Sequence, residues 1–239
     1  MRQYIDRVPN APRPLSLTLE RRRLRAARPP SQCEICRNWN DGRLCADCRA
    51  RHVQTRTRCG RCALPVAAGV SPCGACLRQP PNFLHAVCAV DYAFPWDRLV
   101  LDLKFHGLVE LAAPLAQLLV QALRAGDGAR GVDAVLAVPL GPKRLAERGY
   151  NQAWELARRV ARELSLPAGA HALERPVDGA HQADLPREAR AANLRGAFMV
   201  APRQRQWVAG RRLALVDDVM TTGATAREAS AALLRAGAA

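Results

Sequence analysis

Hydrophobic and polar positions follow two different periods along the chain after residue 80. Short apolar runs predict strands, and apolar stripes at helical spacing predict the helices between them. Strands are expected near 87–94, at 133–138 and at 212–216, and helices from Pro95 to about Phe105, from Leu108 to about Arg124, over 151–165 and from Thr225 onward. Strands that alternate with helices predict an α/β fold, with a mostly parallel sheet and helices on both faces. Ligands of such sheets bind beyond the carboxyl ends of the strands.

The segment before residue 80 is organised by cysteines instead. Eight of the nine cysteines form four Cys-x-x-Cys pairs within residues 33–76, and Cys88 is left over. Two such pairs can close a tetrahedral zinc site, and a site made of four thiolates leaves no position open for water or substrate. We therefore expect two structural zinc ions. The sequence leaves the pairing open, and the simplest arrangement places Cys33, Cys36, Cys45 and Cys48 around one ion and Cys59, Cys62, Cys73 and Cys76 around the other.

Other uses of cysteine fit this segment less well. A disulfide framework needs an oxidising compartment, and the arginine-rich N-terminus has no apolar signal region. A thioredoxin-like site needs one Cys-x-x-Cys pair on a βα unit rather than four in series. A zinc deaminase needs His-x-Glu, and no histidine here is followed two residues later by Glu. Cys88 lies in an apolar run and is expected to fill the core.

Charge divides the chain of 239 residues in the same place. The net charge is +15, and residues 1–80 hold 16 basic against 5 acidic residues, whereas residues 81–239 hold 20 against 16. Two zinc ions with four thiolates each would lower the front segment from +11 to +7. Such a surface attracts nucleic acids. Because 34 of the 36 basic residues are arginine, codon usage explains the excess equally well, and both interpretations stay open.

These observations divide the chain into a basic tail over 1–30 that is expected to be disordered, a double zinc ribbon over 31–80 and an α/β domain over 81–239. No apolar run reaches the roughly 20 residues of a membrane-spanning helix. With no secretory signal either, the sequence predicts a cytoplasmic protein without membrane insertion.

The segment from Leu213 to Thr225 carries the most specific chemistry. An apolar strand ends in Asp217 and Asp218, and a turn of small and hydroxyl residues then opens a helix. Backbone N–H groups, hydroxyls and the helix dipole predict a phosphate site made of Thr221, Thr222, Gly223, Ala224 and Thr225. The carboxylates suit sugar hydroxyls or a hydrated magnesium ion, so the segment predicts a site for a phosphorylated ribose. The alternative is a helix N-terminus capped by Asp and Thr.

Two nucleotide-binding motifs do not apply. Gly126-x-Gly128-x-x-Gly131 matches the dinucleotide fingerprint in letters, but it follows a predicted helix and precedes a strand, the reverse of the required context. A P-loop is absent from the sequence.

The segment from Leu213 to Thr225 resembles the phosphoribosyl-pyrophosphate motif of type I phosphoribosyltransferases, and with the cysteine pairs the chain from about residue 31 resembles the ComF family of competence-associated proteins. The motifs that support this are Leu103-Lys104-Phe105-His106-Gly107, Val138-Pro139-Leu140, Arg148-Gly149-Tyr150-Asn151-Gln152, Gln182 with Leu185, Arg190 with Asn193, and Gly196 with Phe198. The resemblance implies a type I phosphoribosyltransferase fold with a hood over the acceptor at about 176–195. It also implies a further strand after the last helix, which this sequence does not include.

The same resemblance implies phosphoribosyl pyrophosphate with Mg2+ as the ligand, and pyrophosphate bound by the stretch that begins at Pro139. Candidate pyrophosphate and hood residues are Lys104, Arg148, Asn151, Gln182, Arg190 and Asn193. Two hypotheses follow. The chain is either a phosphoribosyltransferase, or at least a binder of phosphoribosyl pyrophosphate or ribose 5-phosphate, with an unknown acceptor. Or it is a competence factor without turnover that binds single-stranded DNA through the basic zinc module and uses the pocket to sense a ligand. Either role allows protein partners of DNA uptake.

Overall fold

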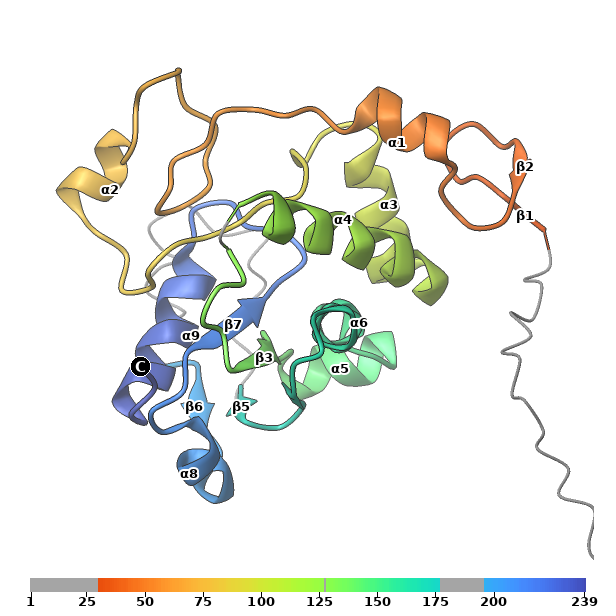
Figure 1. Ribbon diagram of the computed structural model, residues 1–239. Helices are drawn as coiled ribbons and strands as arrows, with labels where there is room; N and C mark the ends of the chain where they lie inside the picture. Colours follow the sequence, from red (N-terminus) through yellow and green to blue (C-terminus); the bar gives the residue numbers. More distant parts are fainter. Residues whose placement is uncertain (1–29, 127, 177–195) are drawn as a thin grey trace, which may run out of the picture.

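The computed structural model describes residues 30–126, 128–176 and 196–239 (Figure 1). The basic tail expected over 1–30 therefore lies outside the described residues except for its last position. Most of the accessory layer expected at 176–195 lies outside them too.

The centre of the fold is a three-stranded parallel sheet. It consists of β3 (Ala134–Ala137), β4 (Ala168–Gly169) and β7 (Leu213–Val216), in the order β4-β3-β7. In the register of the ladder, Ala134 lies opposite Leu213 and Ala137 opposite Val216. The strands predicted at 133–138 and 212–216 are confirmed, as is their parallel arrangement.

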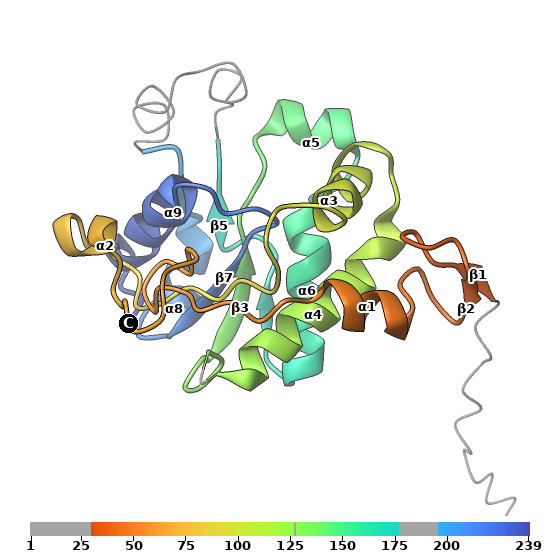
Figure 2. The ribbon, with the colours of Figure 1, turned by 90° about the horizontal axis from the view of Figure 1, so that it is seen from above.

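Helices cover both faces of this sheet, because alternate residues of a strand point to opposite sides. Val135 and Ala137 pack against α6 (Gln152–Leu164), while Leu136 and Leu215 pack against α9 (Ala224–Arg235). Figure 2 shows α6 and α9 on opposite sides of β3 and β7. The α/β architecture expected from the sequence is confirmed.

The remaining helices build a second layer behind α6. α3 (Trp96–Phe105) and α4 (Ala112–Ala125) match predicted helices, and a 3-10 turn (Val109–Leu111) joins them. The sequence did not predict α5 (Pro142–Arg148) or α8 (Arg205–Val208), nor the antiparallel pair of β5 (Leu173–Glu174) and β6 (Met199–Val200). A second 3-10 turn (Pro202–Gln204) precedes α8.

The cysteine-rich segment contains little regular structure. It holds the ribbon of β1 (Ser31–Gln32) and β2 (Trp39–Asn40), and the short helices α1 (Ala46–His52) and α2 (Gly74–Arg78). Cys33, Leu44 and Cys48 share one buried cluster with residues of α3 and α4. The first half of this segment is therefore part of the larger core.

The strand expected at 87–94 is wrong, since these residues form no regular element. Residues 82–92 instead line a cavity of about 860 Å3 that also borders β7 and α4. A strand forms only where a neighbour lies within about 5 Å. Among the described residues β7 pairs with β3 alone, and the cavity separates its other edge from 87–94. No helix in the described part of the chain is long and apolar enough to cross a membrane.

Candidate functional site

The acidic pair lies where the parallel sheet ends. Asp217 and Asp218 directly follow β7, and the backbone N–H of Val138, after β3, donates to the carbonyl of Val216 at 2.9 Å. The two strands therefore end side by side. The pair also borders the cavity beside β7.

Asp218 has one partnered and one unpartnered oxygen. Its Oδ1 lies 2.9 Å from the Lys104 ammonium, and the Asp218 side chain is only 5% exposed. Its Oδ2 is buried and has no hydrogen-bond partner. A buried acceptor without a partner is costly, so this oxygen is the point in the site where a ligand hydroxyl gains most.

Asp217 is in a different state. Burial, together with the charge of Asp218, raises the pKa of Asp217 to about 7, although the Asp218 backbone N–H donates to its Oδ1 at 2.9 Å. Near neutral pH the carboxyl of Asp217 therefore holds a proton for part of the time. This leaves the pair with less than two negative charges, and Lys104 faces it with one positive charge.

The turn after the acidic pair has the features of an anion site. Thr221 and Thr222 are exposed, and Gly223 adopts φ +73° as the N-cap of α9, a conformation that a side chain would strain. The Thr222 hydroxyl accepts from the N–H of Ala224 at 3.4 Å, and Thr225 lies in the first turn. The N–H groups of this turn have no partner within the helix. Because the N-cap is Gly223 without a side-chain hydrogen bond, Asp217 and Asp218 do not cap α9.

Cations approach the acidic pair from two helix ends. Lys104 lies in the last turn of α3, and Arg148 is the last residue of α5. The Arg148 guanidinium lies 4.8 Å from the centre of the Phe105 ring. Burial lowers the pKa of Arg148, and the nearby charge of Asp218 opposes that shift. The Tyr150 hydroxyl donates to the carbonyl of Leu103, which ties the end of α3 to the loop after α5.

Asn151 has a structural use. Its Oδ1 accepts from the N–H groups of Ala153 and Trp154 and caps α6, while its Nδ2 donates to the carbonyl of Val138 at 3.0 Å. It thus fixes the residue that follows β3. The other hood candidates, Gln182, Arg190 and Asn193, lie outside the described residues. The sequence showed no signal for the contacts of Phe105 and Tyr150, because both depend on how the helices meet.

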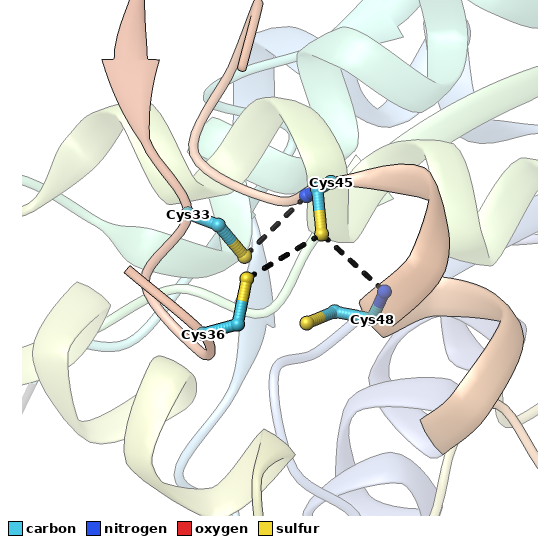
Figure 3. A group of neighbouring side chains, drawn as sticks. All are labelled: Cys33, Cys36, Cys45 and Cys48. Carbon is cyan, nitrogen blue, oxygen red and sulfur yellow. Dashed lines mark hydrogen bonds between the residues drawn. The ribbon is translucent and has the colours of Figure 1, made fainter. Parts of the chain in front are cut away.

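The eight paired cysteines form two groups with the membership that the simplest pairing predicts. Within each group all four sulfur atoms lie within 4.8 Å of one another, and Figure 3 shows the first group. Cys36 Sγ lies 3.8 Å from Cys45 Sγ, and Cys62 Sγ lies 3.7 Å from Cys73 Sγ. Zn–S bonds of about 2.3 Å in a tetrahedron place the sulfurs about 3.8 Å apart, so both groups could hold zinc.

Backbone donors already polarise these thiols. Burial opposes ionisation of Cys33 and Cys59, but backbone N–H groups, including those of Cys45 and Cys73 respectively, lower the pKa of each to about 6. Burial raises the pKa of Cys76 to about 12, and neighbouring thiols add to this effect. Each group therefore has one thiol that ionises readily and others that need a metal. Cys88, expected in the core, is only half-buried, and burial raises its pKa.

Comparison with known proteins places the chain. It is 37% identical over 220 residues to DNA utilization protein YhgH of Salmonella typhimurium and 35% identical over 219 residues to YhgH of Escherichia coli K12, which covers 88% of this chain and 93% of each relative. It is 32% identical over 197 residues to Competence protein F of Haemophilus influenzae, over 81% of this chain and 85% of that relative.

The chain belongs to the ComF family. No family model and no solved structure matches it. Membership agrees with the resemblance found in the motifs, and the acidic pair and the cysteine groups are the parts of this ComF protein whose geometry suggests chemistry.

Proposed function

We propose that this ComF protein binds phosphoribosyl pyrophosphate at the carboxyl end of β7 and transfers the phosphoribosyl group to an acceptor. The observation that carries the proposal is the buried, unpartnered Oδ2 of Asp218 beside the open N-terminus of α9. This places an acceptor for a sugar hydroxyl beside N–H donors for a phosphate. The proposal implies a type I phosphoribosyltransferase fold.

In this proposal each part of the ligand has its own group of residues. The 5-phosphate is bound by the turn from Thr221 to Thr225, and the ribose hydroxyls donate to Asp217 and Asp218. Pyrophosphate lies toward Arg148 and the stretch that begins at Pro139. Bound Mg2+ supplies positive charge to the pyrophosphate.

The reaction breaks the bond between the anomeric carbon and the pyrophosphate oxygen, and a new bond forms from that carbon to the acceptor. Positive charge develops on the ribose and negative charge on the leaving group. Arg148 stabilises the departing pyrophosphate, and the carboxylates of the pair lie near the positive ribose. None of the described residues at this site is placed as a dedicated general base, so the acceptor is a group that is already nucleophilic.

Each four-cysteine group holds one zinc ion in this proposal, with a structural role. The sulfur–sulfur distances of 3.7 and 3.8 Å support it. Metal binding requires deprotonated thiols, and the lowered pKa of Cys33 and Cys59 favours the first step.

A role in the use or uptake of DNA is also proposed, because the relatives are called DNA utilization protein and Competence protein F. The charge distribution sets where a strand of DNA would bind. Residues 31–80 contain eight arginines and three acidic residues, so two four-thiolate zinc sites reduce their net charge to about +1. Arg37 and Arg43 pair with Glu34, and Arg56 and Arg58 pair with Asp91. We therefore assign single-stranded DNA mainly to the tail before residue 30.

Calorimetry with phosphoribosyl pyrophosphate and Mg2+ tests the pocket, followed by an assay for released pyrophosphate. The Asp217→Asn, Asp218→Asn double variant should bind at least about tenfold more weakly, because hydrogen bonds to charged groups contribute about 1.5 to 3 kcal/mol each. Asp41→Asn, at an exposed position in the cysteine-rich segment, is the matched control. Equal binding by the double variant and the control would reject the proposed site.

A further inference from the structure

Lys104 differs from the other cations of this chain. Of 36 basic residues only Lys104 and Lys143 are lysine, and Lys104 is the one placed against the acidic pair. Its side chain is 17% exposed, and its ammonium contacts one oxygen of Asp218 at 2.9 Å. An ammonium is a compact charge that fits a single oxygen, whereas a guanidinium favours two oxygens in a plane.

The surroundings hold Lys104 in this position. Leu99 and Leu103 of α3 are buried, and the Tyr150 hydroxyl donates to the carbonyl of Leu103, directly before Lys104 in the chain. The ammonium is therefore presented by a fixed helix end. Its charge acts on Asp217 too, where it lowers the pKa against the effect of burial.

A divalent cation and this ammonium compete for the same place. A metal bound directly to Asp218 would lie within a few ångströms of the Lys104 charge, and like charges at such distances repel strongly where solvent is scarce. A sugar hydroxyl carries no charge and needs only an acceptor. The free Oδ2 of Asp218 offers that acceptor while Oδ1 keeps its contact with Lys104.

We propose that Lys104 is the resident cation of the acidic pair, and that it makes the pair a receptor for ribose hydroxyls while it excludes a divalent metal from these carboxylates. The sugar part of this inference rests on the proposed function, and the exclusion of metal does not. Mg2+ that arrives with pyrophosphate is then held by the ligand, and the chain contacts it through the ligand alone.

The first experiment uses the metal alone, so that it is independent of any sugar ligand. Zinc-loaded protein is titrated with Mn2+, which favours the same carboxylate ligands as Mg2+, and binding is followed by electron paramagnetic resonance. Wild type and Lys143→Gln, the matched control on α5, should bind no Mn2+ at the pair. Lys104→Gln should bind Mn2+ at least about tenfold more tightly than wild type, and Lys104→Gln, Asp218→Asn should lose that gain. Lys104→Arg keeps the charge and should still exclude the metal.

Equal Mn2+ affinity in wild type and Lys104→Gln would overturn the inference, and so would a gain that survives Asp218→Asn. Thermal melting of each variant checks that the fold persists, and Lys104→Arg keeps the test valid if Lys104→Gln does not fold. In that case, Lys104→Arg binding Mn2+ as tightly as wild type supports the inference only if wild type also binds none.

The second experiment uses ribose 5-phosphate, which has no pyrophosphate to carry a metal. Wild type should bind it equally well with and without millimolar Mg2+, in buffers free of chelator so that the cysteine sites stay intact. Lys104→Gln should bind it more weakly and regain affinity with Mg2+. Wild-type binding that requires Mg2+ would overturn the inference, whereas a wild type that binds no ribose 5-phosphate at all would instead refute the proposed function.

Discussion

Replacing Asp217 by asparagine should remove a pH-dependent cost of folding. Burial raises the pKa of Asp217 from 3.8 to about 7, so its ionised form is less stable in the folded protein than in the unfolded chain. Between these two pH values the folded state holds a proton that the unfolded state has released. Wild-type stability should therefore fall as pH rises from about 4 to about 7, and should change little from this group above that range.

The pKa shift sets the size of the effect. Each pKa unit corresponds to about 1.4 kcal/mol, so a rise of about three units gives at most about 4 kcal/mol at pH 8. Asparagine has nearly the same shape and keeps an oxygen that can accept the Asp218 N–H, which limits other changes. The variant should equal wild type in stability near pH 4 and exceed it increasingly toward pH 8.

The assay is urea unfolding of wild type and Asp217→Asn at several pH values in this range. Histidines, cysteines and zinc sites are common to both proteins, so the difference in unfolding free energy isolates position 217. Asp41→Asn, at an exposed site, provides the baseline. If the difference between wild type and Asp217→Asn stays constant from pH 4 to pH 8, Asp217 titrates alike in both states and the account of the acidic pair is wrong.

Three further predictions concern the other parts of the molecule. Purified protein should contain about two zinc ions by elemental analysis; Cys33→Ser should lower the melting temperature of the whole α/β domain because its group shares a core with α3 and α4, whereas Cys59→Ser, whose buried cluster holds only the four cysteines with Val66 against them, should unfold only its own segment, as hydrogen exchange would show. Arg148→Ala should weaken phosphoribosyl pyrophosphate by about 1.5 to 3 kcal/mol and leave ribose 5-phosphate unchanged in calorimetry, and equal losses for both ligands would place Arg148 away from pyrophosphate. Removal of residues 1–29, which hold eight arginines and two acidic residues, should abolish most of the salt-dependent binding of single-stranded DNA, with a slope lost of about 0.7 per phosphate contact, and an unchanged slope would return the contact to the zinc module.

The strength of the sequence lay in features that neighbouring residues decide. Cys-x-x-Cys pairs place two thiolates on one ion within a single turn of chain, and the two cysteine groups have the membership that the spacing predicted. The period of apolar residues predicted α3, α4 and α6 and the strands β3 and β7, because side chains one helical turn or two strand positions apart share a face. The acidic pair was located for the same reason, since it directly follows an apolar run.

Tertiary structure decided which of these elements meet, and there the sequence failed or was silent. Residues 87–94 have the composition of a strand, but a strand depends on hydrogen bonds to a neighbour, and here a cavity lies where that neighbour would be. Lys104 was expected near pyrophosphate but lies on Asp218, and Asn151 caps a helix and fixes the residue after β3. These contacts join groups that are far apart along the chain, so their energy depends on distance and burial in the folded molecule, which no local pattern of residues records.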